Sequence, residues 1–233
     1  MKSTDTVSGI IDYLNQHDLR AANSDWRERP LYIDEDGVNA SYAGFKLGSL
    51  FQPIVTHDKD RAHVVAYEAL LAVHAASGSP LHSVIEPEAL FLSQPGNKEI
   101  TLLDRLARTL HALNFLLQDV DGALHLNVHP LHVLAVSADH GLVFEKILRQ
   151  CGLEPTSITL EIPEHHIRDK HSLHVAIREW QSRGYKIAID QFGEKHFTLE
   201  RVLELEPNVI KLAPALAEHA VDCMPQRDKD KIA

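Results

Sequence analysis

The sequence has few cysteines, no long apolar run and no excess of basic residues, and each absence excludes a class of protein. Only Cys151 and Cys223 occur in 233 residues, so neither a disulfide framework nor a cysteine-rich zinc site is expected. No stretch reaches the roughly 20 apolar residues of a membrane helix, and the N-terminus lacks the basic start and apolar run of a signal peptide. We therefore expect a protein of the reducing cytoplasm.

Charge and histidine content set two further limits. The chain carries 33 acidic and 23 basic residues, a formal net charge of -10, which opposes binding to nucleic acid or to an anionic membrane. We expect neither as a partner. The 16 histidines are scattered, and the adjacent His165 and His166 point in different directions on any regular element. The histidines therefore do not predict a metal site of their own.

From about residue 50 onward, short β-like runs alternate with helical periods, a pattern typical of a largely parallel sheet with crossover helices. Leucines recurring at helical spacing predict a helix over 102–117. Three more helices, each followed by Gly or Pro, are predicted over 139–151, 170–183 and 198–205. The predicted strands are 49–55, 63–70, 124–128, 157–162, 186–190 and 209–212.

The two ends of the chain differ from this central part. Residues 7–16 read as an amphipathic helix, and residues 31–42 read as two strands around an Asp-Glu-Asp-Gly turn. We expect an N-terminal extension over 1–48, an α/β domain over 49–220 and a charged, disordered tail over 221–233.

Polar side chains stand in, or at the end of, five predicted strands. In a (β/α) barrel the C-terminal strand ends converge on one face, so these side chains are expected to meet. Carboxylate and amide oxygens suit Mg²⁺ or Mn²⁺. The pattern alone leaves open the alternative that each residue only caps the following helix. The five residues are Glu68, Asn127, Glu161, Asp190 and Lys211.

The sequence around these positions resembles the EAL domain, a bacterial cyclic di-GMP phosphodiesterase family. The resemblance covers about residues 48–213 and implies a TIM-barrel-like (β/α) fold. Its five motifs, in the family's order, are LFQPIV at 50–55, AYEALL at 66–71, LHLNVHP at 124–130, LEIPE at 160–164 and the segment from IDQFG to VIKLA at 189–213.

The resemblance also implies a chemistry. In active members, acidic residues and one Asn hold two divalent metals, which activate a water to attack the phosphodiester. Lys211 matches the catalytic lysine, and Gln52 in the opening strand matches a possible nucleotide contact. Mg²⁺ or Mn²⁺ would be the cofactor. The residues that match metal ligands are Glu68, Asn127, Glu161 and Asp190.

The chain departs from the family pattern at several of its functional positions. Gln191 replaces the second Asp of the DDFG motif and supplies a neutral, weaker ligand. Ala72 replaces a phosphate-binding Arg, which weakens any contact with cyclic di-GMP. Ala213 replaces an Asp, and EKHFT at 194–198 replaces the TGxSS turn. The family's last two strands have no counterpart, and only Glu218 stands roughly where a late carboxylate is expected.

Three hypotheses follow. The first is a degenerate, inactive EAL domain that acts in signalling by binding a protein partner or, weakly, cyclic di-GMP. The second is a working phosphodiesterase that uses the four remaining ligands. The third is that function depends on assembly, because a barrel without its last two strands has open sheet edges. In that case residues 1–48, or a second copy of the chain, would pack across the gap.

Overall fold

The structure is a computed structural model that describes residues 4–17, 30–58, 61–75, 84–135, 141–163, 169–193 and 199–222. His165, His166 and Cys223 lie outside these ranges, as do the EKHFT segment and the tail from residue 223.

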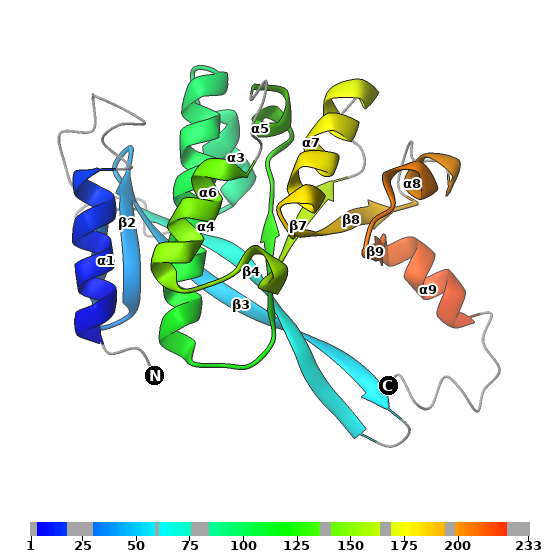
Figure 1. The fold of residues 1–233 in the computed structure, drawn as a ribbon, viewed down its shortest axis with the longest axis horizontal. Helices are drawn as coiled ribbons and strands as arrows, with labels where there is room; N and C mark the ends of the chain where they lie inside the picture. Colours follow the sequence, from blue (N-terminus) through cyan, green and yellow to red (C-terminus); the bar gives the residue numbers. More distant parts are fainter. Residues whose placement is uncertain are drawn as a thin grey trace.

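One mixed sheet forms the centre of the molecule (Figure 1). Its strands follow one another in the order β1-β2-β3-β4-β6-β7-β8-β9, and the short β5 (Val84–Ile85) pairs with β4. The pairings from β1 to β4 are antiparallel, and those from β4 to β9 are parallel. The strands are β1 Leu31–Asp34, β2 Gly37–Tyr42, β3 Phe45–Asp58, β4 Arg61–Ala75, β6 Ala123–Asn127, β7 Ile158–Pro163, β8 Lys186–Phe192 and β9 Val209–Leu212.

The helices follow the crossover pattern predicted from the sequence. All four predicted central helices and the N-terminal helix are present, whereas three short helices that begin at proline were missed. The confirmed helices are α1 Thr4–Gln16, α4 Asn97–Gln118, α6 Leu142–Cys151, α7 Lys170–Ser182 and α8 Leu199–Leu205. The missed helices are α3 Pro87–Leu92, α5 Pro130–Ala135 and α9 Pro214–Asp222.

The core lies between the parallel strands and the helices that connect them. Strand residues alternate between two faces, so Leu124 and Leu126 of β6 point to one side and His125 to the other. Leu106 and Leu110 of the leucine stripe of α4 are fully buried in the same apolar cluster. The helical face therefore buries the hydrophobic side of the sheet and leaves the other side for polar residues.

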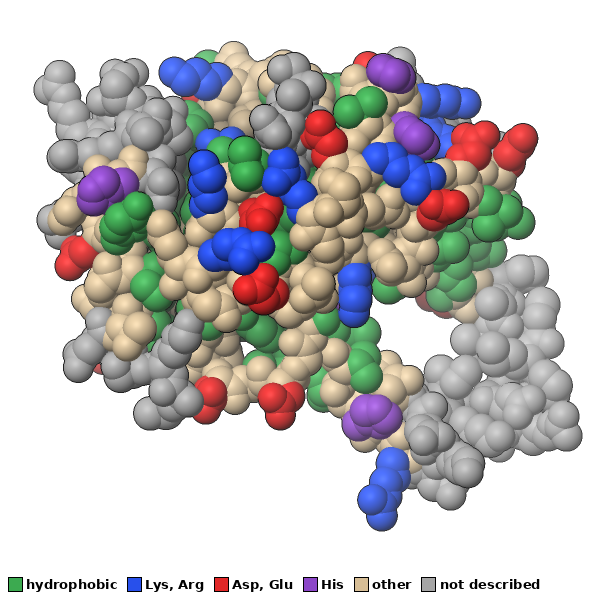
Figure 2. All heavy atoms as spheres, viewed as in Figure 1, with side chains coloured by type: hydrophobic (Ala, Val, Ile, Leu, Met, Phe, Trp, Pro, Cys, Tyr) green, Lys and Arg blue, Asp and Glu red, His purple; other side chains and the backbone are tan. Residues whose placement is uncertain are grey.

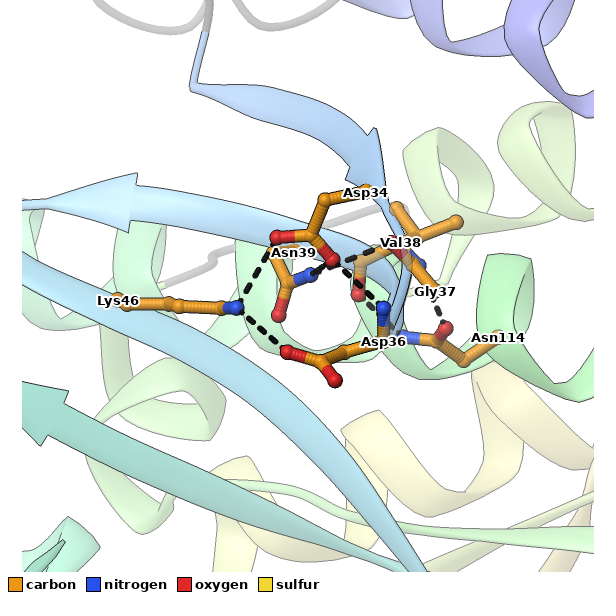
Figure 3. Close-up of polar contacts among 7 residues, drawn as sticks. All are labelled: Asp34, Asp36, Gly37, Val38, Asn39, Lys46 and Asn114. Atoms are coloured by element: carbon orange, nitrogen blue, oxygen red, sulfur yellow. Dashed lines mark hydrogen bonds and ion pairs between the residues drawn. The ribbon is translucent and has the colours of Figure 1, made fainter.

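The predicted N-terminal hairpin is confirmed, and α4 fastens it to the rest of the fold (Figure 3). Asn114 accepts a hydrogen bond from the Val38 backbone N–H at 2.9 Å and donates one to the Val38 carbonyl at 2.7 Å. Gly37 has a φ of +113°, and a Cβ there would lie 2.9 Å from the Asn114 Oδ1 atom. Glycine is therefore required at this contact.

The hairpin continues directly into the central sheet. β3 runs through residue 48, the predicted end of the extension, and pairs with β2 on one side and with β4 on the other. Beyond this body, β3 and β4 project as a long two-stranded ribbon (Figure 1). The hairpin covers part of the β3 edge and does not reach β9, which pairs only with β8 among the described residues. The described part of residues 1–48 therefore extends the sheet at the β3 edge and does not join it to β9; whether a second copy packs there stays a prediction.

The surface carries both signs of charge. On the face drawn in Figure 2, acidic and basic side chains are interspersed. Every helix in the described part of the chain is too short or too polar to cross a membrane.

Candidate functional site

The five polar residues occupy five of the strands of the curved sheet, and Glu68 lies in the middle of its strand because β4 continues to Ala75. Glu68 lies in β4, Asn127 ends β6, and Glu161 lies in β7. Asp190 lies in β8 and Lys211 in β9. Asn127 and Glu161 are direct neighbours in the β6–β7 ladder. The structure therefore brings together the residues that the sequence predicted to meet.

Lys211 lies at the centre of this group. Its ammonium Nζ is 2.6 Å from Glu68 Oε2 and 2.7 Å from Glu161 Oε2, and it is 3.6 Å from Asp190 Oδ1. β4 and β9 are separated by three strands, so in a flat sheet they would lie about 19 Å apart. The direct contact between Glu68 and Lys211 therefore requires a strongly curled sheet, as in a barrel wall.

His125 completes the group and was not identified from the sequence. Its Nδ1 atom lies 2.7 Å from Glu161 Oε1, and its side chain is buried. Asn127 donates to Glu68 Oε1 at 3.3 Å. The signal that could have revealed His125 is its position two residues before Asn127, because alternate strand residues share a face. The interactions link Asn127, Glu68, Lys211, Glu161 and His125 into a continuous chain, which we call the lysine cluster.

Within the lysine cluster, Glu161 and Lys211 favour each other's charged form. Burial alone would raise the pKa of the Glu161 carboxyl, but the His125 hydrogen bond and the Lys211 charge outweigh it and lower that pKa. Burial alone would lower the pKa of Lys211, but the charge of Glu161 and the hydrogen bonds that Lys211 donates to Glu161 and Glu68 raise it. Each ion therefore stabilises the charged form of the other.

The replaced family positions lie close to this group in the chain. Gln191 follows Asp190 with a φ of 55°, where the β8–β9 register shifts. Ala213 is buried, and its N–H donates to the Phe192 carbonyl. None of the ion pairs that join the described residues of the site involves Glu218, which is exposed on α9.

Two predicted nucleotide positions lie on the antiparallel part of the sheet. Gln52 is exposed on β3 and pairs directly opposite Glu68. Ala72 is buried on β4, four residues beyond Glu68 and therefore on the same face. A methyl group at position 72 offers no charge to a phosphate.

The residues present do not fit a divalent metal pair. In the part of the chain that the structure describes, no group of three or more His, Cys, Asp or Glu side chains is arranged to hold a metal ion. The acids of the site surround an ammonium, and Gln191 supplies a neutral amide where the resemblance expects a second Asp. The donor set is therefore short of negative charge for hard dications.

Comparison with known proteins identifies relatives of the chain. The profile of the EAL domain family matches residues 42–228. The uncharacterised EAL-domain protein YkuI of Bacillus subtilis is 29% identical over 167 residues, which cover 70% of this chain and 39% of YkuI. The chain thus spans about two fifths of that relative.

Solved structures support the same fold. The structure of Bacillus subtilis YkuI with cyclic di-GMP and calcium has a TM-score of 0.58 and 25% identity, and the match covers 75% of this chain and 44% of that one. A Klebsiella pneumoniae protein in complex with manganese and cyclic di-GMP has a TM-score of 0.60 and 20% identity, covering 75% of this chain and 42% of that one. The second likeness shows the fold alone.

Proposed function

Because the chain belongs to the EAL domain family, we propose that it is a member that does not hydrolyse cyclic di-GMP and acts by recognition in cyclic di-GMP-related signalling. The family consists generally of cyclic di-GMP phosphodiesterases. The proposal is therefore that this member has lost the hydrolytic activity. A cytoplasmic setting suits a chain with only two cysteines.

The observation that carries the proposal is the neutral side chain at three positions where the resemblance expects a charged one. Gln191 follows Asp190 in place of a second Asp, and Ala72 and Ala213 replace an Arg and an Asp. Two-metal hydrolysis needs acidic ligands that hold two dications and activate a water. Lys211, which matches the catalytic lysine, contacts Glu68 and Glu161 at 2.6 Å and 2.7 Å, but it does not supply the missing ligands. Such a site favours recognition over phosphodiester cleavage.

Among the possible ligands, we propose that a protein partner is the main one and that cyclic di-GMP binds weakly. A phosphate gains most from a charge-assisted, bidentate contact with Arg, and position 72 provides a buried methyl group. Gln52 remains exposed opposite Glu68 and offers an amide to a nucleotide. One amide does not replace the missing guanidinium.

An active phosphodiesterase is the second candidate, because the matched ligands do come together. In that case Glu68, Asn127, Glu161 and Asp190 would hold Mg²⁺ or Mn²⁺, and Lys211 would be the catalytic lysine. Structures of similar proteins contain calcium or manganese together with cyclic di-GMP.

A turnover and binding experiment separates the two candidates. The purified chain is incubated with cyclic di-GMP and Mg²⁺ or Mn²⁺, products are separated by chromatography, and binding is measured by calorimetry with and without metal. We expect no linear dinucleotide and weak, metal-independent binding. The control is the Glu200→Ala variant, which removes an exposed acid of α8. Linear product that persists in this control and disappears in Glu68→Ala would establish the phosphodiesterase instead.

A further inference from the structure

We propose that a protein partner docks on the edge of β9 that faces away from β8 and adds a β-strand with alternating apolar and basic side chains to the sheet. This inference rests on the proposed function, because it names the kind of partner that recognition would involve. It goes further by assigning the contact to one edge of the sheet and by specifying the chemistry of the strand that binds there.

The two edges of the sheet differ in how their backbone groups are covered. At the β1 edge, the Leu31 N–H donates to Asn15 Oδ1 at 3.1 Å, and the Leu31 carbonyl accepts from Asn15 Nδ2 at 2.8 Å. Leu31 is buried, so α1 covers this edge. β9, in contrast, pairs with β8 alone among the described residues. A sheet edge without such a cover is a template for a further strand.

The backbone of β9 presents a donor to such a strand. The Asn208 N–H, at the start of β9, donates to the Ile187 carbonyl of β8 at 2.8 Å. Successive N–H groups of a strand point to opposite sides, so the N–H of Val209 points away from β8. When a strand adds to a sheet edge, main-chain hydrogen bonds give affinity and alternate side chains give specificity. The β9 edge therefore selects an extended partner segment.

Apolar side chains are exposed on the helical side of β9. Ile210 is 41% exposed, whereas Ile189, its direct neighbour on β8, is fully buried. Further exposed leucines lie on α8 and α9, the helices that precede and follow β9, and Figure 2 shows hydrophobic side chains gathered there. We call this surface the β9 patch, and its members are Leu199, Leu203, Ile210, Leu212 and Leu216. An exposed apolar group rimmed by polar residues marks an interaction site.

Acidic side chains border the β9 patch and specify the charge of the partner. The exposed acids of α8, α9 and the turn after α8 are Glu200, Glu204, Glu206 and Glu218, of which Glu206 pairs with Arg178. On the concave side of the sheet, three carboxylates surround the single ammonium of Lys211. A second copy of the chain, with a net charge of -10, would bring like charges together here. A strand with basic side chains instead meets opposite charge.

The test measures binding of a short fluorescent peptide in which valine and lysine alternate. Fluorescence anisotropy is followed while the full chain is titrated into this peptide or into a matched peptide in which glutamate replaces lysine. We expect the lysine peptide to bind at least about tenfold more tightly than the glutamate peptide, because its charge is complementary to that of the edge. Equal affinity for both peptides, or no binding of either, would overturn the proposal.

Leu203→Glu separates docking on the β9 patch from general attraction between a basic peptide and an acidic protein. Leu203 is 65% exposed, and the substitution removes an apolar contact while it adds an acid. Docking on the patch should weaken at least about fivefold, whereas general charge attraction should strengthen. Leu92→Glu is the matched control, because Leu92 is 77% exposed on α3 and the change of charge is the same. It should bind the peptide at least as tightly as the wild type. Similar behaviour of the two variants would show that the patch is not the docking site.

Two further measurements test the strand geometry. Val209→Pro removes the outward N–H without changing the charge, and an edge strand tolerates proline, so this variant should lose affinity for the lysine peptide. In the wild type, the peptide should slow hydrogen exchange of the Val209 amide, and an unchanged exchange rate would contradict strand addition even where Val209→Pro does not fold.

Sedimentation of the wild type without peptide tests the other occupant. We expect a monomer. A dimer that Leu203→Glu dissociates would show that a second copy occupies the edge, and the proposal would be wrong. Failure of the peptide to bind would refute this inference and leave the proposed function standing. Hydrolysis of cyclic di-GMP by the wild type would instead contradict the proposed function and leave the peptide comparison to decide this inference.

Discussion

A buried ion pair behind the site, between Asp104 and Arg108 of α4, provides the sharpest test of the energetics of this fold. The Asp104 Oδ2 atom lies 2.6 Å from Arg108 Nη2 and 3.1 Å from His132 Nδ1. Its Oδ1 atom accepts the His129 backbone N–H at 2.9 Å. The Asp104 and Arg108 side chains are only 4% and 3% exposed. The carboxylate thus compensates a buried guanidinium and holds the turn that follows Asn127.

We predict that Asp104→Asn lowers the free energy of unfolding by about 3 to 5 kcal/mol, the usual cost of leaving a buried charge without its partner. The Arg108 Nε atom already lacks a hydrogen-bond partner among the described residues, so without Asp104 the guanidinium keeps only the Phe144 ring, 5.0 Å from its Cζ atom, and a 3.4 Å contact with His132. Replacement of Arg108 by Met in the same chain removes that charge and should recover at least about 2 kcal/mol of the loss.

Urea denaturation followed by tryptophan fluorescence measures both effects, since Trp180 is fully buried. With a slope of about 1 to 3 kcal/mol per molar urea, the single variant should unfold at a midpoint lower by about 1 M or more. Arg149→Met is the control, because Arg149 pairs with Glu145 at the same i,i+4 spacing but is 57% exposed. It should cost at most about 1 kcal/mol. If Asp104→Asn is as mild as this control, our account of the buried pair is wrong.

The Asp104–Arg108 pair also predicts that the free energy of unfolding depends on pH. Burial alone would raise the pKa of Asp104, but the charge of Arg108 and the hydrogen bond from His132 lower it well below its usual range. The carboxyl group binds a proton more readily in the unfolded chain, so its stabilising contribution is complete above the unfolded pKa of about 3.9 and is lost as pH falls below it. Asp104→Asn should remove this part of the acid sensitivity.

Two further predictions concern other buried polar groups. Burial lowers the pKa of His111 to about 4. As pH falls through about 6.5, His111 therefore takes up a proton in the unfolded chain but not in the folded one. The free energy of unfolding should drop by about 2 kcal/mol between pH 7 and pH 5 for this reason. Unfolding midpoints at these two pH values should show a smaller drop in His111→Gln. Asn114→Ala should cost about 2 to 4 kcal/mol, because it leaves the Val38 N–H and C=O without partners. The Val38 amide hydrogen should exchange faster with solvent in the Asn114→Ala variant than in the wild type. An unchanged exchange rate would show that Asn114 does not protect the Val38 backbone.

Much of the parallel sheet was predictable because its signals are local. β9 begins and ends where predicted, and α4 follows from its leucine period, which the buried Leu103, Leu106 and Leu110 confirm. The ends of β3 and β4 were not predictable, since residues 45–48 and 71–75 continue as strands by pairing with each other and with the N-terminal hairpin. Pairing between distant segments leaves little trace in local composition.

The meeting of the site residues was predictable, but their mutual contacts were not. Strand-end positions in a repeated βα pattern predict convergence on one face. Whether Lys211 faces a substrate or pairs with Glu68 depends on how far the sheet curls across three strands, which no local pattern specifies. His125 was missed because the histidines were assessed by metal-ligand spacing, and its partner Glu161 lies on the neighbouring strand.

The lysine cluster also bears on how an open sheet keeps a barrel-like curvature. Strand twist alone curls a sheet gradually, and β9 has no further strand beside it among the described residues. The ion pair between Lys211 and Glu68 joins β9 to β4 directly across the concave face, and Glu161 of β7 holds the same ammonium between them. A side chain that matches a catalytic lysine therefore also links the strands of the wall. The residue identity at position 211 is thus explained by structure alone, without requiring catalysis.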